Sequence, residues 1–193
     1  MNTKLIITLC SLLAIPAGQA AVTIGFSDTV GAPNSVTIIP GGTFDVSLML
    51  TSDAEATAGI SYFLQSIGAG NGMFTITARN VTGSAFGDLT TGNGIALPDL
   101  LDPVNNHELG GLTTGASNGI GTFQVATYTI QADLGITPGS YTISTSGAQA
   151  IDDSFDSISL NQASYGVTVV PEPGTALQLG LGLAGVALRR RKP

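Results

Sequence analysis

The sequence contains few basic residues. Its 193 residues include six Lys and Arg against thirteen Asp and Glu. Between Lys4 and Arg189 the only base is Arg79. A protein that binds nucleic acid needs a stripe of bases to displace the counterions of the phosphates. We therefore exclude nucleic acid as a partner.

The sequence has one cysteine and no tryptophan. The single cysteine, Cys10, lies in an N-terminal segment that we expect to be removed. The mature protein would then have no disulfide, no thiol nucleophile and no thiolate metal site. There is no tryptophan, and the seven Phe and four Tyr mostly fall at strand positions that indicate a core. This composition argues against the aromatic-lined cleft that is typical of sugar-cleaving enzymes.

The middle of the chain also lacks any amphipathic helical pattern sustained over three turns. It shows instead alternating or β-branched runs separated by Gly, Pro or Asn. With 43% hydrophobic residues, the chain can bury a core. The spacing of the turns predicts one all-β domain, an antiparallel two-sheet β-sandwich. The expected strands are residues 22–26, 35–39, 43–51, 60–66, 73–79, 121–132, 140–145 and 165–170.

Residues 89–114 interrupt this rhythm. The segment is rich in glycine and has an apolar, Asp-containing centre at residues 95–103. We predict a long surface loop with one short helical turn. Long loops in compact domains are often functional.

The N-terminus has the layout of a secretory signal peptide. Lys4 precedes an apolar run from Leu5 to Ile15, and small residues lead to Ala20 and Ala21. We expect the Sec machinery to export the chain and signal peptidase to cleave between Ala20 and Ala21. The signal peptide would occupy residues 1–20 and form a short helix. Its apolar run is too short to span the membrane as a permanent anchor.

The C-terminus carries a second address, residues 171–193. A proline-rich box precedes a weakly apolar stretch, residues 174–188, and a basic tail follows it. Basic residues after an apolar stretch stay cytoplasmic, so the ectodomain, residues 21–170, would lie across the membrane. At 1.5 Å per residue the stretch would form a short, weakly held transmembrane helix. The box is Val170, Pro171, Glu172 and Pro173, and the tail is Arg189, Arg190, Arg191 and Lys192.

This order of box, short helix and basic tail resembles the PEP-CTERM sorting signal. That signal is paired with exosortase membrane enzymes in Gram-negative bacteria that make exopolysaccharide. The resemblance covers residues 170–193 and implies transient anchoring in the inner membrane. It also implies that an exosortase removes the tail near Pro171 to Pro173 and that the ectodomain reaches the outer surface or the matrix.

The ectodomain resembles cohesin-type bacterial surface sandwiches. The resemblance rests on Pro40-Gly41 before an alternating strand, a late Pro138-Gly139-Ser140-Tyr141 strand, and a final valine strand at residues 166–169. A generic immunoglobulin-like or jelly-roll sandwich remains the alternative. Cohesins bind dockerin-type partners through one sheet face, so the resemblance implies a binding module.

The patterns that could support catalysis are weak. Gly115 to Gly119 matches the G-x-S-x-G elbow around Ser117, but a loop precedes it and a strand follows, and His107 lies on the wrong side in chain order. Asp99, Asp102 or Glu108 could meet across the loop as paired carboxylates. A secreted hydrolase is therefore only a remote alternative, and we predict that the protein is not an enzyme.

One acidic cluster offers oxygen ligands. Asp152, Asp153 and Asp156 lie within five residues, and calcium prefers such hard ligands. The segment lacks the glycine and the terminal glutamate of an EF-hand loop, so a solvated acidic turn is the alternative. No other cofactor is expected, and we keep calcium as a candidate ligand of these three carboxylates.

Together these features predict an exported, exosortase-processed protein of the cell surface or extracellular matrix. It would be structural rather than catalytic and associated with exopolysaccharide. The alternative is a cohesin-like module that binds a surface protein or a carbohydrate.

Overall fold

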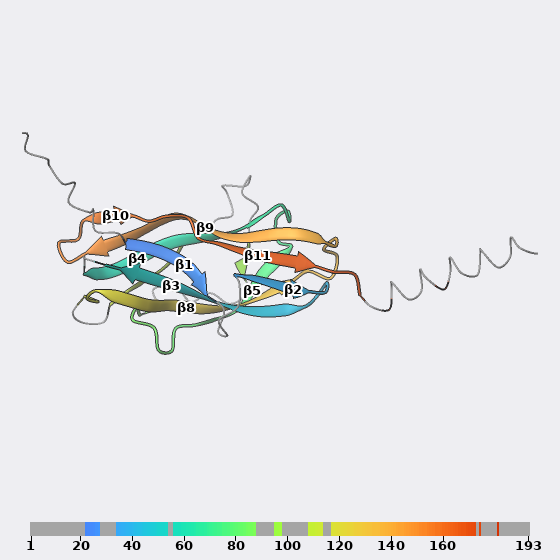
Figure 1. Cartoon of the computed structure of the whole chain (residues 1–193), viewed down its shortest axis with the longest axis horizontal. Coiled ribbons are helices and arrows are strands. Elements are labelled where there is room, and N and C mark those ends of the chain that lie inside the picture. The colour runs from blue at the N-terminus through green and yellow to red at the C-terminus, as the bar shows by residue number, and fades with distance from the viewer. Residues whose placement is uncertain are drawn as a thin grey trace, which may run out of the picture.

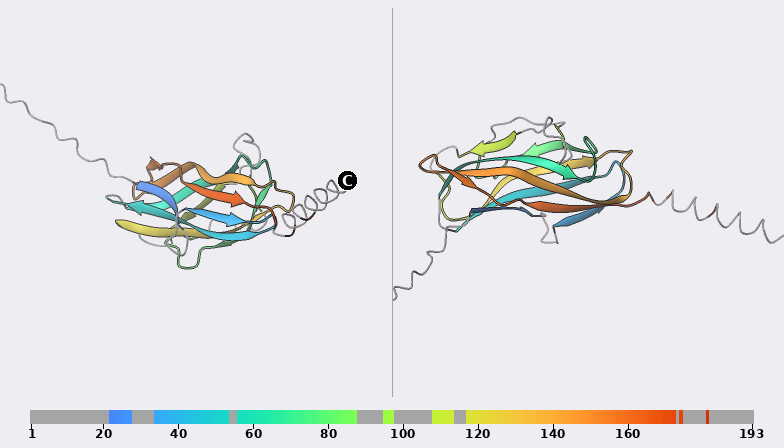
Figure 2. Two further views of the ribbon diagram at one scale, coloured as in Figure 1. Left: turned by 45° about the vertical axis from the view of Figure 1, so that its right-hand side comes forward. Right: turned by 90° about the horizontal axis from the view of Figure 1, so that it is seen from above.

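The domain between the two predicted addresses is a β-sandwich of two facing sheets (Figures 1 and 2). A computed structural model describes residues 22–27, 34–53, 56–87, 95–97, 108–113 and 117–172, together with Gly174 and Leu181. The predicted all-β, two-sheet class is confirmed. The predicted signal helix and the short C-terminal helix, apart from Gly174 and Leu181, lie outside the described residues.

The first sheet has five strands in the order β1-β3-β8-β5-β6, and the second has six, β2-β11-β9-β4-β7 with β10 paired to β9. The strands of the first sheet are β1 (Val22–Ser27), β3 (Thr43–Ser52), β5 (Phe74–Asn80), β6 (Ile95–Ala96) and β8 (Gly121–Ala132). Those of the second are β2 (Ser35–Ile38), β4 (Thr57–Ile67), β7 (Glu108–Leu112), β9 (Gly139–Asp152), β10 (Ser157–Ser159) and β11 (Ser164–Val169).

Alternating burial explains why these segments form strands. In β3, Phe44, Val46, Leu48 and Leu50 are buried, whereas Asp45 between them is exposed. Side chains of a strand point to opposite faces in turn, so the apolar set of each sheet faces its partner sheet. The core therefore lies between the two layers.

The pairing differs from the expected one at the edge of the second sheet. β2 runs parallel to β11, whereas every other described strand pair is antiparallel. The period of apolar residues specifies which face of a strand is buried but not the direction of its neighbour. The tight turn at Pro40 and Gly41 carries the chain from β2 in one sheet to β3 in the other, so these two strands do not form a hairpin.

The prediction that residues 89–114 form a loop throughout is wrong, because β6 and β7 lie within this segment. β7 pairs with β4 despite two adjacent glycines that ordinarily weaken a strand. A Cβ on Gly110 would lie 2.7 Å from the Ile60 carbonyl oxygen, and the position of a Cβ on Gly111 falls against the Gly87 carbonyl. Only glycine fits this close approach.

Aromatic side chains fill one half of the core. Phe44 stacks on Tyr165 with ring centroids 5.8 Å apart, and meets Phe74 edge-on at 6.5 Å. Phe74 in turn meets Tyr141 edge-on at 5.8 Å. Because these rings come from both sheets, the cluster holds the layers together, and each such pair adds about 0.5–1.5 kcal/mol beyond area burial.

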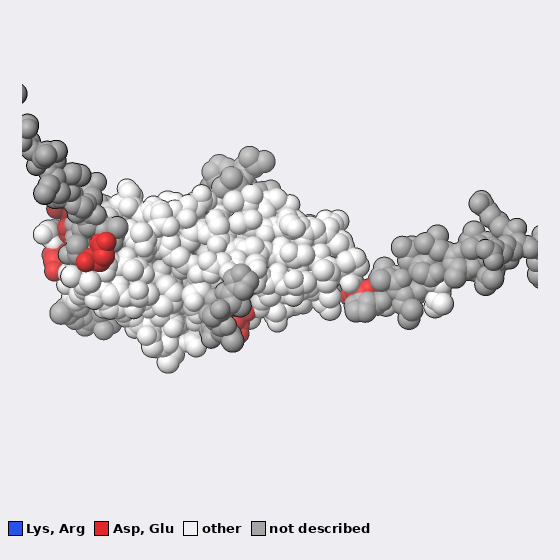
Figure 3. Space-filling view, in the orientation of Figure 1, with Lys and Arg blue, Asp and Glu red and all other residues white. Residues whose placement is uncertain are grey.

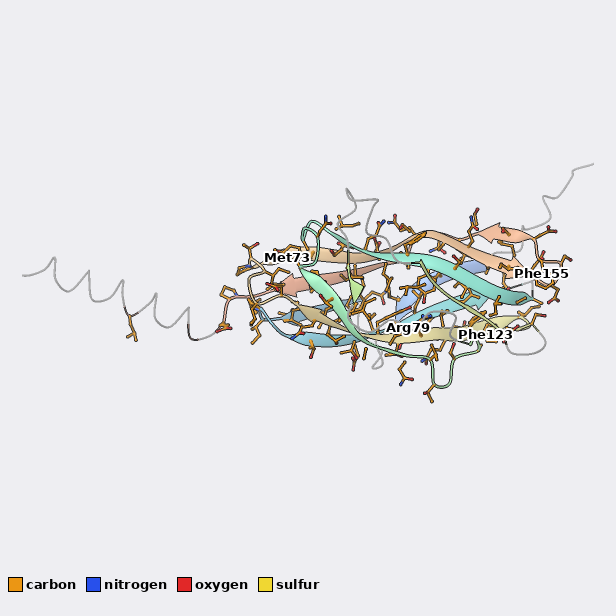
Figure 4. The ribbon with its side chains drawn as sticks, turned by 180° about the vertical axis from the view of Figure 1, so that it is seen from behind. Met73, Arg79, Phe123 and Phe155 are labelled. Atoms are coloured by element: carbon orange, nitrogen blue, oxygen red, sulfur yellow. The ribbon has the colours of Figure 1, made fainter. Side chains whose placement is uncertain are left out.

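A polar group of three residues joins the sheets near the middle of the sandwich. The hydroxyls of Tyr62 on β4 and Tyr128 on β8 share a buried hydrogen bond. Arg79 on β5 has its Cζ 5.8 Å from the centroid of the Tyr128 ring and donates from Nη2 to the Gly110 carbonyl at 2.9 Å (Figure 4). The only base between Lys4 and Arg189 therefore bridges the two layers.

Candidate functional site

The C-terminal box follows the last strand without a linker. β11 ends at Val169, and the Val170 amide donates to the Ile38 carbonyl at 2.8 Å. Val170 is half-buried, whereas Pro171 and Glu172 are exposed. A proline after the strand cannot donate to a ladder, so it ends the pairing here. The box thus begins at the point where the chain leaves the sandwich.

Most of the remaining predicted address residues lie outside the described residues. These are Pro173, the basic residues Arg189, Arg190, Arg191 and Lys192, and the signal-cleavage residues Ala20 and Ala21. No helix in the described ranges is long and apolar enough to cross a membrane. Gly174 and Leu181 are both exposed.

The predicted acidic cluster forms a closed hairpin turn between β9 and β10. Oδ1 of Asp152 accepts the backbone amides of Ser154 and Asp156, both at 2.8 Å. The Asp152 amide donates to the Asp156 carbonyl at 3.0 Å, and the Phe155 amide to the Asp152 carbonyl at 3.1 Å. One carboxylate therefore caps the turn, which is the ordinary role of Asp in such loops. Among the described residues no three metal-ligating side chains are grouped to hold an ion, and calcium binding stays a prediction.

Phe155 occupies an unusual position in this turn. Its φ is 65°, in the left-handed region that favours glycine, and its side chain is 80% exposed. A bulky residue in this conformation costs about 1–2 kcal/mol, and here no burial offsets it. Figure 4 shows the ring at one end of the sandwich, far from Met73.

Carboxylates gather at this same end (Figure 3). Asp53 directly follows β3, whose Ser52 pairs with Val22, and Asp152 pairs with Thr57 at the start of β4. Asp153 and Asp156 belong to the adjoining turn. We call this the acidic end. The tail leaves from the opposite end, beyond Val169.

The residues considered for catalysis are not brought together in the described part of the chain. Ser117 is half-buried, and its neighbour Asn118 pairs with Thr57 ahead of β8, so a strand follows the serine. Asp99, Asp102 and His107 lie outside the described residues, and Glu108 begins β7 with only its backbone described. A strand after Ser117 is not the helix that a nucleophile elbow requires.

The outer face of the first sheet carries paired hydroxyls. Ser47 and Thr127 are hydrogen-bonded at 2.9 Å, and Thr51 and Thr122 at 3.0 Å, each pair across β3 and β8. The Thr129 hydroxyl donates to Asp45 at 2.6 Å. These hydroxyls and the Asp45 carboxylate satisfy one another across the two strands.

Comparison with known proteins identifies the C-terminal address. Residues 169–192 match the model of the PEP-CTERM protein-sorting motif. The motif indicates export and a C-terminal membrane-anchoring sorting signal, as the sequence predicts. No curated protein sequence is a significant match to the chain.

Solved cohesin modules have the same fold as the ectodomain, which confirms the cohesin-like interpretation. The third ScaB cohesin of R. flavefaciens, solved with a group 1 dockerin, gives a TM-score of 0.55 at 13% identity, covering 80% of this chain and 99% of that one. A cohesin module of a Clostridium perfringens family 33 glycoside hydrolase gives 0.53 at 11%, covering 79% and 98%. A non-cellulosomal cohesin of the archaeon Archaeoglobus fulgidus gives 0.51 at 11%, covering 81% and 96%.

At these identities the likeness concerns the fold alone. The protein is thus a cohesin-like β-sandwich that carries a PEP-CTERM sorting motif.

Proposed function

We propose that the protein is an exported, exosortase-processed component of the outer surface or exopolysaccharide matrix of a Gram-negative bacterium, structural rather than catalytic. Its signal peptide, residues 1–20, is removed by signal peptidase after Sec export. The ectodomain, residues 21–170, is held briefly at the inner membrane and is released when an exosortase cuts near Pro171 to Pro173.

The observation that carries this proposal is the position of the box. The last ladder hydrogen bond is made by Val170, and the next two residues are exposed. A proline fixes its own φ and disfavours helical backbone at the residue before it, so the sequence of the box favours the extended conformation that a protease binds. A cut here removes the tail without breaking any strand.

The charge distribution supports the same orientation. The tail leaves from the end opposite the acidic end. A domain anchored through its tail holds the four carboxylates of the acidic end away from an anionic lipid surface, which would repel them over about one Debye length, ~8 Å at physiological salt. Asp133 and Glu172, at the tail end, are the carboxylates nearer to the membrane in this orientation.

Mass spectrometry of the intact protein tests the processing. Protein from the matrix fraction should begin at Ala21 and end near Pro171 to Pro173. A Pro171→Ala/Pro173→Ala variant should keep its tail and stay with the membrane fraction, whereas Pro138→Ala, at an exposed proline of another turn, should be processed normally. Full-length protein in the cytoplasm, or equal processing of both variants, would contradict the proposal.

A second candidate function is a cohesin-like module that binds a protein partner. The specific observation that favours it is the shared fold, since one similar cohesin was solved with its dockerin. The outer face of β4 also presents two half-buried apolar side chains, Phe63 and Ile67.

A pull-down from matrix extract tests this second function. Wild-type protein should retain a defined protein partner, Phe63→Ser should lose it, and Thr51→Ala on the outer face of the other sheet should keep it. Retention that both variants leave unchanged would contradict binding through the β4 face.

A further inference from the structure

A cleft lies along the part of β9 between its pairing with β10 and its pairing with β11. β9 pairs with β10 at Gln149 to Ile151 and with β11 at Gly139 to Ser144. In between, the chain segment 160–163 is bonded to β9 by the Leu160 amide to the Ala148 carbonyl at 2.9 Å, and by the Thr145 amide to the Ala163 carbonyl at 3.0 Å. Between these two bonds, residues 161–162 make no ladder hydrogen bond with β9.

The side chain of Asn161 holds this segment against β1 of the other sheet. Its Oδ1 accepts the Ile24 amide at 2.8 Å, and its Nδ2 donates to the Ile24 carbonyl at 2.9 Å. The side chain thus forms two strand-like hydrogen bonds with the edge strand β1 of the other sheet. The result is a cleft of about 350 Å³ between β9 and the β10–β11 connection.

The cleft is uncharged, and its lining mixes polar side chains with the apolar Ala148 and Leu160. Its lining contains no Asp, Glu, Lys or Arg, although the chain as a whole has a net charge of −7. Within the described residues no hydrogen bond occupies the side chains of Ser146, Gln149, Ser159 and Gln162, which line it. Hydroxyls and amides each offer both donors and acceptors, so these four groups can bind a ligand that does the same.

Gly147 of β9 lines this cleft without a side chain. Gly147 has a φ of 57°, and a Cβ at this position would lie 3.3 Å from Cδ2 of Phe63. A side chain here would be strained and crowded. The backbone at Gly147 therefore stays exposed at the bulge of β9, where neither β10 nor β11 pairs with this strand.

We propose that this cleft binds a short stretch, about one or two sugar units, of a neutral polysaccharide; its volume lies at the small end of the ~300–1,000 Å³ typical of ligand pockets. Sugar hydroxyls match a lining of hydroxyls and amides, and the absence of bases disfavours anionic sugars. No aromatic residue lines the cleft, so each contact is weak, and a polymer that engages many copies gains avidity. This site deepens the proposed matrix function and rests on it for its biological setting.

Nuclear magnetic resonance on the full-length chain tests the site. The chain is labelled with ¹⁵N and held in a zwitterionic detergent without a sugar headgroup. The probes are short neutral oligosaccharides of glucose, mannose, galactose and N-acetylglucosamine, with oligogalacturonate as the anionic comparison. At least one neutral probe should give saturable shifts of the Gln149 and Gln162 side-chain amides and of the Gly147 backbone amide.

Variants then assign the binding to the cleft. Gln149→Ala/Gln162→Ala should weaken the affinity about tenfold or more, since it removes hydrogen bonds to the ligand. Ser159→Glu, which places a carboxylate at the rim, should weaken it as well. Gln124→Ala/Thr122→Ala removes an amide and a hydroxyl from the outer face of the other sheet and should leave the affinity unchanged.

Three results would overturn the site: no saturable shift with any neutral probe, equal binding of oligogalacturonate, or an affinity that the cleft variants leave unchanged. This outcome is separable from the processing test. A protein that is processed but does not bind sugar refutes the cleft alone, and a protein that binds sugar but keeps its tail refutes the processing alone.

Discussion

The two ends of the sandwich are built differently. At the end from which the tail leaves, Phe44, Phe74, Tyr141 and Tyr165 form a continuous aromatic cluster between the sheets. At the acidic end, by contrast, a large aromatic side chain, Phe155, faces solvent in a left-handed backbone conformation (Figure 4). The aromatic packing therefore lies next to the C-terminal box, whereas the strained backbone of Phe155 and the cluster of four carboxylates lie at the opposite end. Asp133 and Glu172 are exposed carboxylates at the tail end.

This difference suggests a division of roles. Under the proposed function, the tail end has to remain folded while the chain is anchored and cut, and its strands are held by aromatic rings that pack between the sheets. The acidic end is free of that requirement, and its turn is closed by hydrogen bonds to one carboxylate. The following predictions test whether stability and strain are divided in this way.

The largest effect is expected from Phe44→Ala. Phe44 is buried and contacts two other rings, so the loss should destabilise the fold by about 3–5 kcal/mol through lost burial and a cavity. Chemical denaturation of the full chain measures it. Phe123→Ala, which removes a partly buried ring near the acidic end, is the control and should cost clearly less. If both variants lose the same free energy of unfolding, aromatic packing does not stabilise the tail end more than the acidic end.

A smaller loss is expected from Asp152→Ala. This carboxylate accepts two backbone amides in the β9–β10 turn, so its removal should destabilise the fold by about 1 kcal/mol. Asp153→Ala is the matched control in the same turn and should change the melting temperature little. If both variants melt alike, the cap contributes nothing measurable.

Phe155→Gly should stabilise the protein. Glycine adopts a φ of 65° without the steric cost that a side chain brings, so a gain of about 1 kcal/mol is expected. Phe155→Ala separates the backbone from the ring, because it removes the ring and keeps the strain. A gain with Ala as large as with Gly would place the cost in the exposed ring and not in the backbone.

The smallest expected effect is stabilisation by calcium at the acidic end. For a dissociation constant of about 10⁻⁴ to 10⁻³ M, millimolar calcium adds about 0.4 to 1.4 kcal/mol to the folded state. Because Asp152 caps the turn, the informative variant is Asp153→Asn/Asp156→Asn, which should abolish the shift in melting temperature while the turn stays closed. Equal shifts with magnesium or sodium chloride at matched ionic strength would indicate screening and no calcium site.

Several features of the fold were predictable from local sequence. The alternation of Phe44, Val46, Leu48 and Leu50 predicts β3, and the Pro40-Gly41 pair predicts the turn before it. β9 was expected to end at Thr145, but the strand continues to Asp152 through a bulge at Gly147. The residues after Thr145 include glycine and small polar residues with low strand propensity, so the sequence does not predict that the strand continues. Pairing with neighbouring strands stabilises it despite this low propensity.

The candidate cleft could not be predicted, because none of its residues carries a recognisable pattern. Asn161 and Ile24 are 137 residues apart, and their hydrogen bonds shape the cleft. The acidic turn was visible as a cluster, but the capping role of Asp152 and the conformation of Phe155 depend on backbone geometry.

The sequence by itself determined the C-terminal sorting motif and the all-β class, because both depend on residues that are close along the chain: a proline box, an apolar stretch and a basic tail in that order, and apolar residues at every second position of the strands. Only the tertiary structure decided the parallel pairing of β2 with β11, the place of Arg79 between the sheets, and the cleft beside β9. These depend on contacts between residues far apart in sequence, where packing and hydrogen-bond satisfaction outweigh local preference.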